Sequence, residues 1–236
     1  MTTLPDKAEY NCVNTPLSEA PTLPPTSVPS TSLVPVEGTV LRLRELEHAD
    51  ADAVLDIFGD SRTTRCYGSP PLTAAGARAV IDHARTQARQ VPRTFYRLGV
   101  VIRDTDELIG TAKLSLTPPS TDQFVVCNHR AAEFGIALSP DHTNTGLGAE
   151  VGSLLAVLAF DRLALHRMWC LLMPTNTAAI RALDKSGVFV EEARLRHFAH
   201  VDGIWHDMLQ YSILEDDWKA LSQNRPIRSR CSPTAT

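Results

Sequence analysis

The sequence predicts a mixed α/β fold with one central, twisted, mixed β-sheet of about seven strands and about four flanking helices. Two observations lead to this prediction. Strand-like and helix-like segments follow one another in the order β-α-α-β-β-β-α-β-α-β-β. Turn signals join neighbouring strands, and the strongest is the dipeptide Asp202-Gly203. Hairpins interleaved with helices are typical of a sheet that carries helices on its faces.

The first predicted strand lies near the start of the folded core, which we expect to begin at Glu37. Val40–Arg44 alternates apolar and charged residues, the period of a half-buried strand. Ala51–Phe58 and Thr73–Gln90 have helical apolar spacing. The turn-forming sequence Gly-Ser-Pro-Pro at 68–71 separates these two helices.

Three strands are predicted next. Tyr96–Arg103 and Glu107–Leu116 have strand-like composition, and the polar residues Asp104–Asp106 between them predict a hairpin. Ala132–Leu138 is a short, mostly apolar run that ends at a polar loop, so we expect a third strand there.

Helices and strands then alternate. Ala149–Leu165 keeps apolar residues at helical spacing and is apolar on much of its other face, so we expect a well-buried helix. Arg167–Met173 is predicted as a strand. Thr177–Ser186 is predicted as a helix, because Asn176 is suited to cap its start and Gly187 its end.

The last two predicted strands, Arg194–Val201 and Ile204–Ile213, form the hairpin around Asp202-Gly203. Residues 1–36 hold seven of the sixteen prolines, with many Ser and Thr, and predict a disordered tail. We therefore expect one domain at 37–222, followed by a flexible tail at 223–236.

Composition narrows the class of protein. The chain has 236 residues, 43% of them hydrophobic, and a formal charge of −4, which gives no general attraction to nucleic acid or anionic membrane. The longest apolar run, Leu154–Phe160, is far shorter than the roughly 20 residues of a membrane span. With neither a secretory nor a mitochondrial pattern near Met1, we expect a cytoplasmic protein. The five cysteines lack CxxC spacing, so reduced thiols are expected.

A polar, glycine-containing loop joins the strand ending at Leu138 to the helix predicted at Ala149. The start of a helix leaves backbone N–H groups unpaired, and the helix dipole is positive there. Pro140–Glu150 is therefore a natural seat for a pyrophosphate group.

These segments resemble the GNAT superfamily of acyl-CoA N-acyltransferases, specifically the ribosomal-protein N-terminal acetyltransferase (RimJ/RimL-like) branch. The resemblance covers about residues 38–219 and has its blocks in the family's order. The blocks are LRLRELEHADADAVLDIF, ELIGTAKLSL, AEFGIALSPDHTNTGLGAEV and HRMWCLLMPTNTAAIRALDKSGVFVEEARLR, with VDGIWHDMLQYSILEDDW closing the pattern. The resemblance implies acetyl-CoA or another acyl-CoA as co-substrate.

In similar proteins the Gln/Arg-x-x-Gly-x-Gly/Ala loop binds the CoA pyrophosphate through backbone amides. The corresponding residues are Thr143, Asn144, Thr145, Gly146, Leu147 and Gly148. The two glycines stand where backbone must approach phosphate closely. Thr143, Asn144 and Thr145 replace residues that are commonly cationic, amide or glycine in the family, so weaker CoA binding or a different donor is expected.

The resemblance also implies that the strand at Phe134–Leu138 separates from its neighbour and holds the acyl-pantetheine. Backbone groups of Ile136, Ala137 and Leu138 would bind it and polarise the thioester carbonyl. Glu133 matches the family's Ala-Glu-x-Gly position and is a candidate general base. A structural ion pair is the alternative role for this carboxylate.

Asn176 is a candidate for contact with pantetheine or a catalytic water, although capping alone also explains it. The family's usual Ser three residues later is Ala179 here. The sequence therefore does not identify a general acid. Water could protonate the departing CoA thiolate, because a free thiol has a pKa of about 8.5.

We expect direct transfer to a primary amine in a ternary complex, because no cysteine lies at the loop motifs. Arg62, Arg65 and Tyr67 are candidate acceptor contacts. A protein N-terminus and a small-molecule amine both remain open as acceptor, and so do monomer and homodimer. One alternative is a transferase that uses another acyl donor, such as aminoacyl-tRNA, and only in this case would nucleic acid bind. The other alternative is a catalytically silent domain that senses CoA or binds a protein.

No metal site is expected. His197 and His200 are three residues apart on a predicted strand, which points them to opposite faces, and no Cys or carboxylate stands at ligand spacing.

Overall fold

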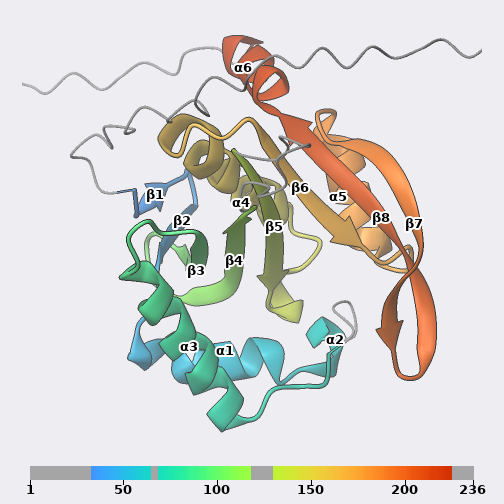
Figure 1. Cartoon of the computed structure of the whole chain (residues 1–236). Helices are drawn as coiled ribbons and strands as arrows, with labels where there is room; N and C mark the ends of the chain where they lie inside the picture. The colour runs from blue at the N-terminus through green and yellow to red at the C-terminus, as the bar shows by residue number, and fades with distance from the viewer. Residues whose placement is uncertain (1–32, 65–68, 118–129, 225–236) are drawn as a thin grey trace, which may run out of the picture. The chain divides into compact units, whose positions relative to one another are not determined.

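The computed structural model describes residues 33–64, 69–117 and 130–224. Figure 1 labels the strands and helices of the chain. The strands are β1 (Val36–Glu37), β2 (Leu41–Glu45), β3 (Phe95–Ile102), β4 (Leu108–Leu116), β5 (Ala131–Leu138), β6 (Arg167–Leu172), β7 (Val190–Val201) and β8 (Ile204–Leu214). The helices are α1 (Ala51–Phe58), α2 (Ser61–Thr64), α3 (Ala74–Ala88), α4 (Leu147–Ala156), α5 (Thr177–Ser186) and α6 (Glu215–Asn224).

All eight strands form one mixed sheet in the order β1-β2-β3-β4-β5-β6-β8-β7. Every neighbouring pair is antiparallel except β5 and β6, which are parallel. The predicted mixed sheet with flanking helices is therefore confirmed. The Asp202-Gly203 hairpin is present, with Val201 opposite Ile204.

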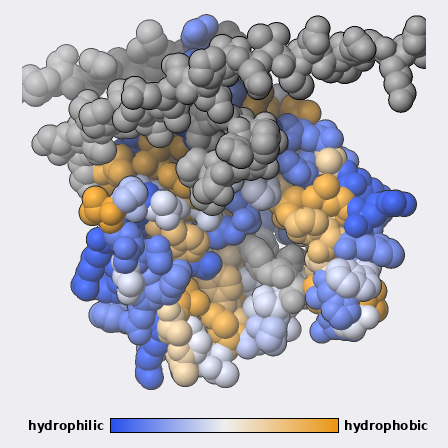
Figure 2. All heavy atoms as spheres, viewed as in Figure 1, coloured by the Kyte–Doolittle hydropathy of each residue, from blue (hydrophilic) through white to orange (hydrophobic). Residues whose placement is uncertain are grey.

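Two apolar clusters hold the helices on the sheet. The larger joins α4 to β2–β6 and β8 through fully buried side chains such as Leu43, Leu98 and Leu155. The smaller packs α1 and α3 together around Val54 and Ile81. The surface of α3 away from this cluster is exposed and hydrophilic, at the lower left of Figure 2. One-sided burial of this kind is what an amphipathic surface helix requires.

Three elements were not predicted, and one predicted helix has different bounds. β1 is an eighth strand that was not predicted, because two residues are too few to show a strand pattern. α6 and the single-turn α2 were not expected. The helix predicted at Ala149 begins at Leu147, immediately after Gly146, and beyond Ala156 it continues as a π-helix, Val157–Arg162.

The ordered domain also begins earlier than the predicted residue 37. Val36 is 1% exposed, and Leu33 and Val34 pack against the large cluster. The Arg162 guanidinium donates hydrogen bonds to the carbonyls of Leu33 (2.6 Å) and Pro35 (2.7 Å). At the other end, α6 extends to Asn224, past the predicted boundary at 222.

These contacts define a deletion experiment. Removing residues 1–32, which lie outside the described part, should leave the melting temperature unchanged, because their Pro/Ser/Thr-rich composition cannot build a core. Removing residues 1–37 also removes Val36, whose burial stabilises by about 1.5–3 kcal/mol. At about 2–4 °C per kcal/mol, this deletion should lower the melting temperature by roughly 5 °C or more. Equal melting temperatures for the two deletions would contradict the packing of the 33–37 segment.

Candidate functional site

The candidate site is the place where β5 and β6 separate. Their parallel pairing covers three residue pairs and ends at Glu133 opposite Trp169. β4 continues to pair with β5 as far as Leu138, opposite Gly110. Figure 1 shows the two strands side by side at one end and apart at the other. Beyond Glu133, one side of β5 is thus turned towards the opening.

Backbone alternation decides which β5 groups face this opening. The Thr117 N–H donates to the Ala131 carbonyl and the Ser139 N–H to the Ile109 carbonyl, both at 2.8 Å. In an unbroken antiparallel ladder, odd-numbered β5 residues therefore bond to β4 and even-numbered residues face β6. Ile136 and Leu138 have the expected orientation. Ala137 does not, because its backbone faces Thr111 on β4, which argues against its predicted role as a donor to a ligand.

The predicted phosphate loop lies directly after β5. A 3-10 turn, Pro140–His142, leads into it, and Gly146 caps α4 with φ +89°. The Thr143 and Thr145 hydroxyls donate to the Pro140 and His142 carbonyls at 2.8 Å, which fixes the loop from within. Within the described residues, the backbone N–H groups of Gly146, Leu147 and Gly148 donate to no protein acceptor. These amides occupy the positive end of the helix dipole.

Both loop glycines are open to the outside. A Cβ atom at Gly146 would meet nothing within 4 Å, and one at Gly148 would meet only the Leu138 Cδ1 at 3.9 Å. Gly146 is required by its left-handed backbone, whereas Gly148 leaves a space next to free amides. An anionic group can approach the backbone there without displacing protein atoms.

A carboxylate in the first turn of α4 connects this helix to the start of β2, at the end of the sheet where β5 also ends. Glu150 Oε1 accepts hydrogen bonds from the backbone N–H groups of Thr39 (2.6 Å), Val40 (2.8 Å) and Leu41 (3.2 Å). With Arg162 at the other end of the same helical segment, Glu150 fixes the chain before β2 along α4. Sequence analysis missed Glu150, and its signal is an acidic residue in a first helical turn.

The loop itself has no Lys or Arg between Thr143 and Gly148. Arg62, a cation that the sequence analysis proposed as an acceptor contact, lies on α2. Its Nη2 is 2.6 Å from Asp60 Oδ2. Asp60 raises the pKa of this guanidinium, and Asp141 beside the loop contributes to the same shift. Arg62 is therefore within electrostatic range of the loop. Arg65 and Tyr67, the other predicted acceptor contacts, lie outside the described residues.

Glu133 sits where the two strands part, and it is ion-paired. Its Oε1 lies 2.7 Å from Lys113 Nζ, and the two side chains are 37% and 27% exposed. The Lys113 stem runs over Gly135, because a Cβ there would lie 3.6 Å from Lys113 Cε. Trp169, directly opposite Glu133 on β6, shares the same face of the sheet. We call the face carrying Lys113, Glu133 and Trp169 the Glu133 face.

Lys113 and Trp169 were missed by sequence analysis. The signal for Lys113 is a single cation within the otherwise uncharged strand sequence LIGTAKLSL. Its approach to Glu133 depends on the β4–β5 register, which no local pattern reveals.

Asn176 is the N-cap of α5, and its Oδ1 accepts a hydrogen bond from the Ala179 N–H at 3.3 Å. Capping is thus the observed role of this side chain. Ala179 places a methyl group where the family usually has a hydroxyl, so α5 offers no side-chain proton donor at that position.

Cys170 is the cysteine within the described residues, and it is buried in β6. Burial raises the pKa of its thiol to about 12, and the Glu133 charge acts in the same direction. The thiol therefore stays protonated at neutral pH and is a poor nucleophile. The other four cysteines lie outside the described residues.

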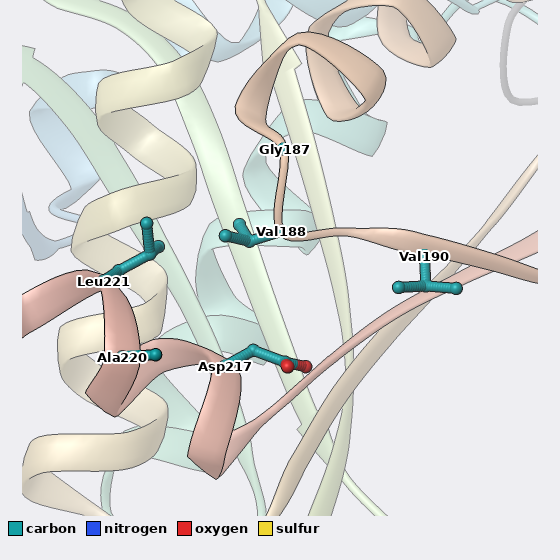
Figure 3. A pocket seen from close by; sticks show the side chains of 6 residues that line it. All are labelled: Gly187, Val188, Val190, Asp217, Ala220 and Leu221. Carbon is teal, nitrogen blue, oxygen red and sulfur yellow. The ribbon is translucent and has the colours of Figure 1, made fainter.

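A separate hollow of about 280 Å³ lies between α6 and the junction of α5 with β7. Its lining is mainly apolar, and Asp217 is the one charged member (Figure 3). The Asp217 carboxylate accepts a hydrogen bond from the Leu214 N–H at 3.0 Å, so one of its oxygens serves the start of α6. No predicted site residue lines this hollow.

The described residues contain no group of three or more His, Cys, Asp or Glu side chains arranged to hold a metal ion. They also contain no helix with the length and apolar character needed to cross a bilayer.

Comparisons with known proteins agree with this geometry. Residues 41–188 match the acetyltransferase (GNAT) domain family. The uncharacterized N-acetyltransferase YoaA of Bacillus subtilis (strain 168) is 30% identical over 175 residues, which cover 74% of this chain and 93% of the relative.

Solved structures show the same fold. The acetyltransferase (GNAT family) from Bacillus anthracis superimposes with a TM-score of 0.65 at 20% identity, covering 78% of this chain and 99% of that one. Spermidine N-acetyltransferase from Vibrio cholerae, in complex with CoA and spermine, gives 0.64 at 21% identity, covering 77% and 99%.

Proposed function

The chain belongs to the acetyltransferase (GNAT) family, and on that premise we propose that it moves an acetyl group from acetyl-CoA directly to a primary amine. The observation that carries this proposal is the separation of β5 from β6 beyond Glu133, with the Gly146–Gly148 amides at the end of the same strand. An extended pantetheine arm can lie beside β5 like an added strand, with its pyrophosphate at the start of α4.

The residues present fit this co-substrate. Gly148 leaves open space where a side chain would block the pyrophosphate, and among the described residues the amides of Gly146, Leu147 and Gly148 have no protein acceptor. Even-numbered β5 residues turn their backbone groups to the pantetheine side. Asn176 caps the start of α5, the helix that follows β6 in the chain.

When bound, acyl-CoA supplies an activated thioester carbonyl. β5 backbone N–H groups hold and polarise that carbonyl, because they are already oriented by the β4 ladder. The acceptor amine enters over the Glu133 face, and the Glu133 carboxylate takes the proton that this amine loses. The amine must be neutral to attack, so a carboxylate at this place removes a proton that would otherwise block the reaction.

The state of Cys170 supports direct transfer, because this buried thiol is unsuited to form an acyl-enzyme. We expect Cys170→Ala to retain turnover within about twofold, because a buried neutral thiol is not the nucleophile. Its stability should fall by only about 1 kcal/mol, the loss for a small buried side chain. Initial-rate kinetics should show intersecting lines in both proteins. Ping-pong kinetics that disappear in Cys170→Ala would contradict direct transfer.

The acceptor is proposed as a primary amine of a small molecule or a protein N-terminus. The relative solved with CoA and spermine supports a small-molecule amine. The resemblance to the RimJ/RimL-like branch supports a protein N-terminus. An acetyl-CoA assay with both kinds of amine, read by thiol release and product mass, tests the proposal. A product heavier by one acetyl group is expected, and absence of any acylated product would overturn it.

A non-CoA acyl donor is the second candidate function. It is favoured by the lack of Lys and Arg between Thr143 and Gly148, and by the acidic Asp141 and Glu150 close by. Thermal protection by CoA separates the two, since CoA at 100-fold its Kd should stabilise the fold by about 2.7 kcal/mol. No shift with CoA, together with no thiol release, would favour another donor.

A further inference from the structure

Among the described residues, two cationic side chains lie close to Glu133 on the Glu133 face. Lys113 on β4 lies directly opposite Arg97 on β3, so the two cationic side chains share this face with Glu133. Arg97 also lies over the Phe95 ring, with 5.9 Å between the guanidinium carbon and the ring centroid. Arg97, Lys113 and Glu133 therefore form a row across three strands.

The Lys113 and Glu133 side chains are partly exposed and form an ion pair, with 2.7 Å between Lys113 Nζ and Glu133 Oε1. An acceptor whose ammonium group approaches Glu133 competes with the Lys113 ammonium for the same carboxylate. Lys113 then needs another anion, because its stem is held along Gly135 and keeps its charge close to the site. An acceptor that brings its own carboxylate satisfies both partners.

We propose that the acceptor is a small molecule with a carboxylate close to its reacting amine, as in an α-amino acid. This inference rests on the proposed function and names the substrate class of that site. The amine of such a molecule meets Glu133 while its carboxylate meets Lys113, which replaces one ion pair by two. Trp169 beside Glu133 offers an aromatic surface to the remainder of the molecule.

The same charges disfavour other amines. A polyamine brings further ammonium groups towards Lys113, and like charges repel at short range. A peptide N-terminus has an amide carbonyl in place of the carboxylate, which forms a weaker hydrogen bond with an ammonium group. The class of acceptor is thus decided by the group attached next to the amine.

The test compares matched acceptors with acetyl-CoA as the donor. The panel holds L-amino acids, the α-carboxamide of each, the decarboxylated amine of each, and spermidine. The preferred amino acid should exceed its carboxamide and its decarboxylated amine by about tenfold or more in kcat/KM, the factor expected for one charge-assisted hydrogen bond. Lys113→Met should erase most of this ratio while the KM for acetyl-CoA stays within about twofold. Lys113→Arg should keep the preference for a carboxylate.

Lys219→Met is the matched control, since Lys219 forms an ion pair of the same 2.7 Å length with Glu215 on α6. It should leave every ratio unchanged. Equal kcat/KM for amino acid and carboxamide, a preference for spermidine, or an unchanged ratio in Lys113→Met would overturn this inference while amine acetylation stands. Failure to acetylate any amine would overturn the proposed function and this inference together.

Discussion

Replacing Glu133 by glutamine is expected to lower turnover at neutral pH by roughly 100-fold to 10,000-fold, the usual contribution of a general base. The carboxamide keeps the shape of the side chain but cannot accept a proton from the acceptor amine. Because Glu133 lies at the end of the β5–β6 pairing, away from the Gly146–Gly148 amides, acetyl-CoA binding should be spared. Single-turnover rates and calorimetric Kd values for acetyl-CoA measure these two quantities.

The ion pair with Lys113 makes a control necessary. Glu215→Gln breaks the Glu215–Lys219 pair, which has the same length on α6, and turnover should not change. A loss of stability in Glu133→Gln, with normal turnover of the folded fraction, would mean that Glu133 serves only as a structural partner of Lys113. An unchanged rate and stability would instead assign the proton to an ordered water.

Gly148→Val is expected to remove most of the affinity for acyl-CoA while the fold remains intact. The new side chain would occupy the open space beside the loop amides, where the pyrophosphate must approach. Among the described residues, its Cβ atom would meet only the Leu138 Cδ1 at 3.9 Å, so little internal repacking is expected. Isothermal titration calorimetry with acetyl-CoA, together with the melting temperature of the free protein, measures both effects.

Gly152→Val provides the matched control, because Gly152 lies one turn further along α4 and a Cβ there meets nothing within 4 Å. It should bind acetyl-CoA like the original chain. Gly146 is a less suitable site, since its φ of +89° would strain any other residue and confuse folding with binding. Unchanged acetyl-CoA affinity in Gly148→Val would refute the phosphate-loop assignment.

Much of the fold can be predicted from local sequence signals. Asp202-Gly203 specifies a tight hairpin, and Asn176 and Gly187 mark the two ends of α5, because turns and caps depend on a few adjacent residues. The phosphate loop is equally local. Its glycines stand next to the start of α4, so their backbone freedom can be inferred from the chain alone.

Elements stabilised by distant partners were missed or misplaced. β1 has two residues and exists because Val36 pairs with Leu43 and is buried. The segment before it is fixed by Arg162, more than a hundred residues away in the chain. No window of local sequence contains both partners, so such contacts have no local pattern.

The amino-acid sequence by itself predicted seven of the eight strands and four of the six helices of the described residues, the loop proposed to receive a phosphate, and, through the family resemblance, Glu133 as the candidate base. Only the tertiary structure decided that β5 and β6 part after Glu133, that Ala137 faces β4, and that Lys113 reaches Glu133. The physical reason is strand register. A shift of one residue between β4 and β5 would move Lys113 to the other face of the sheet, and register is set by burial summed over the whole sheet.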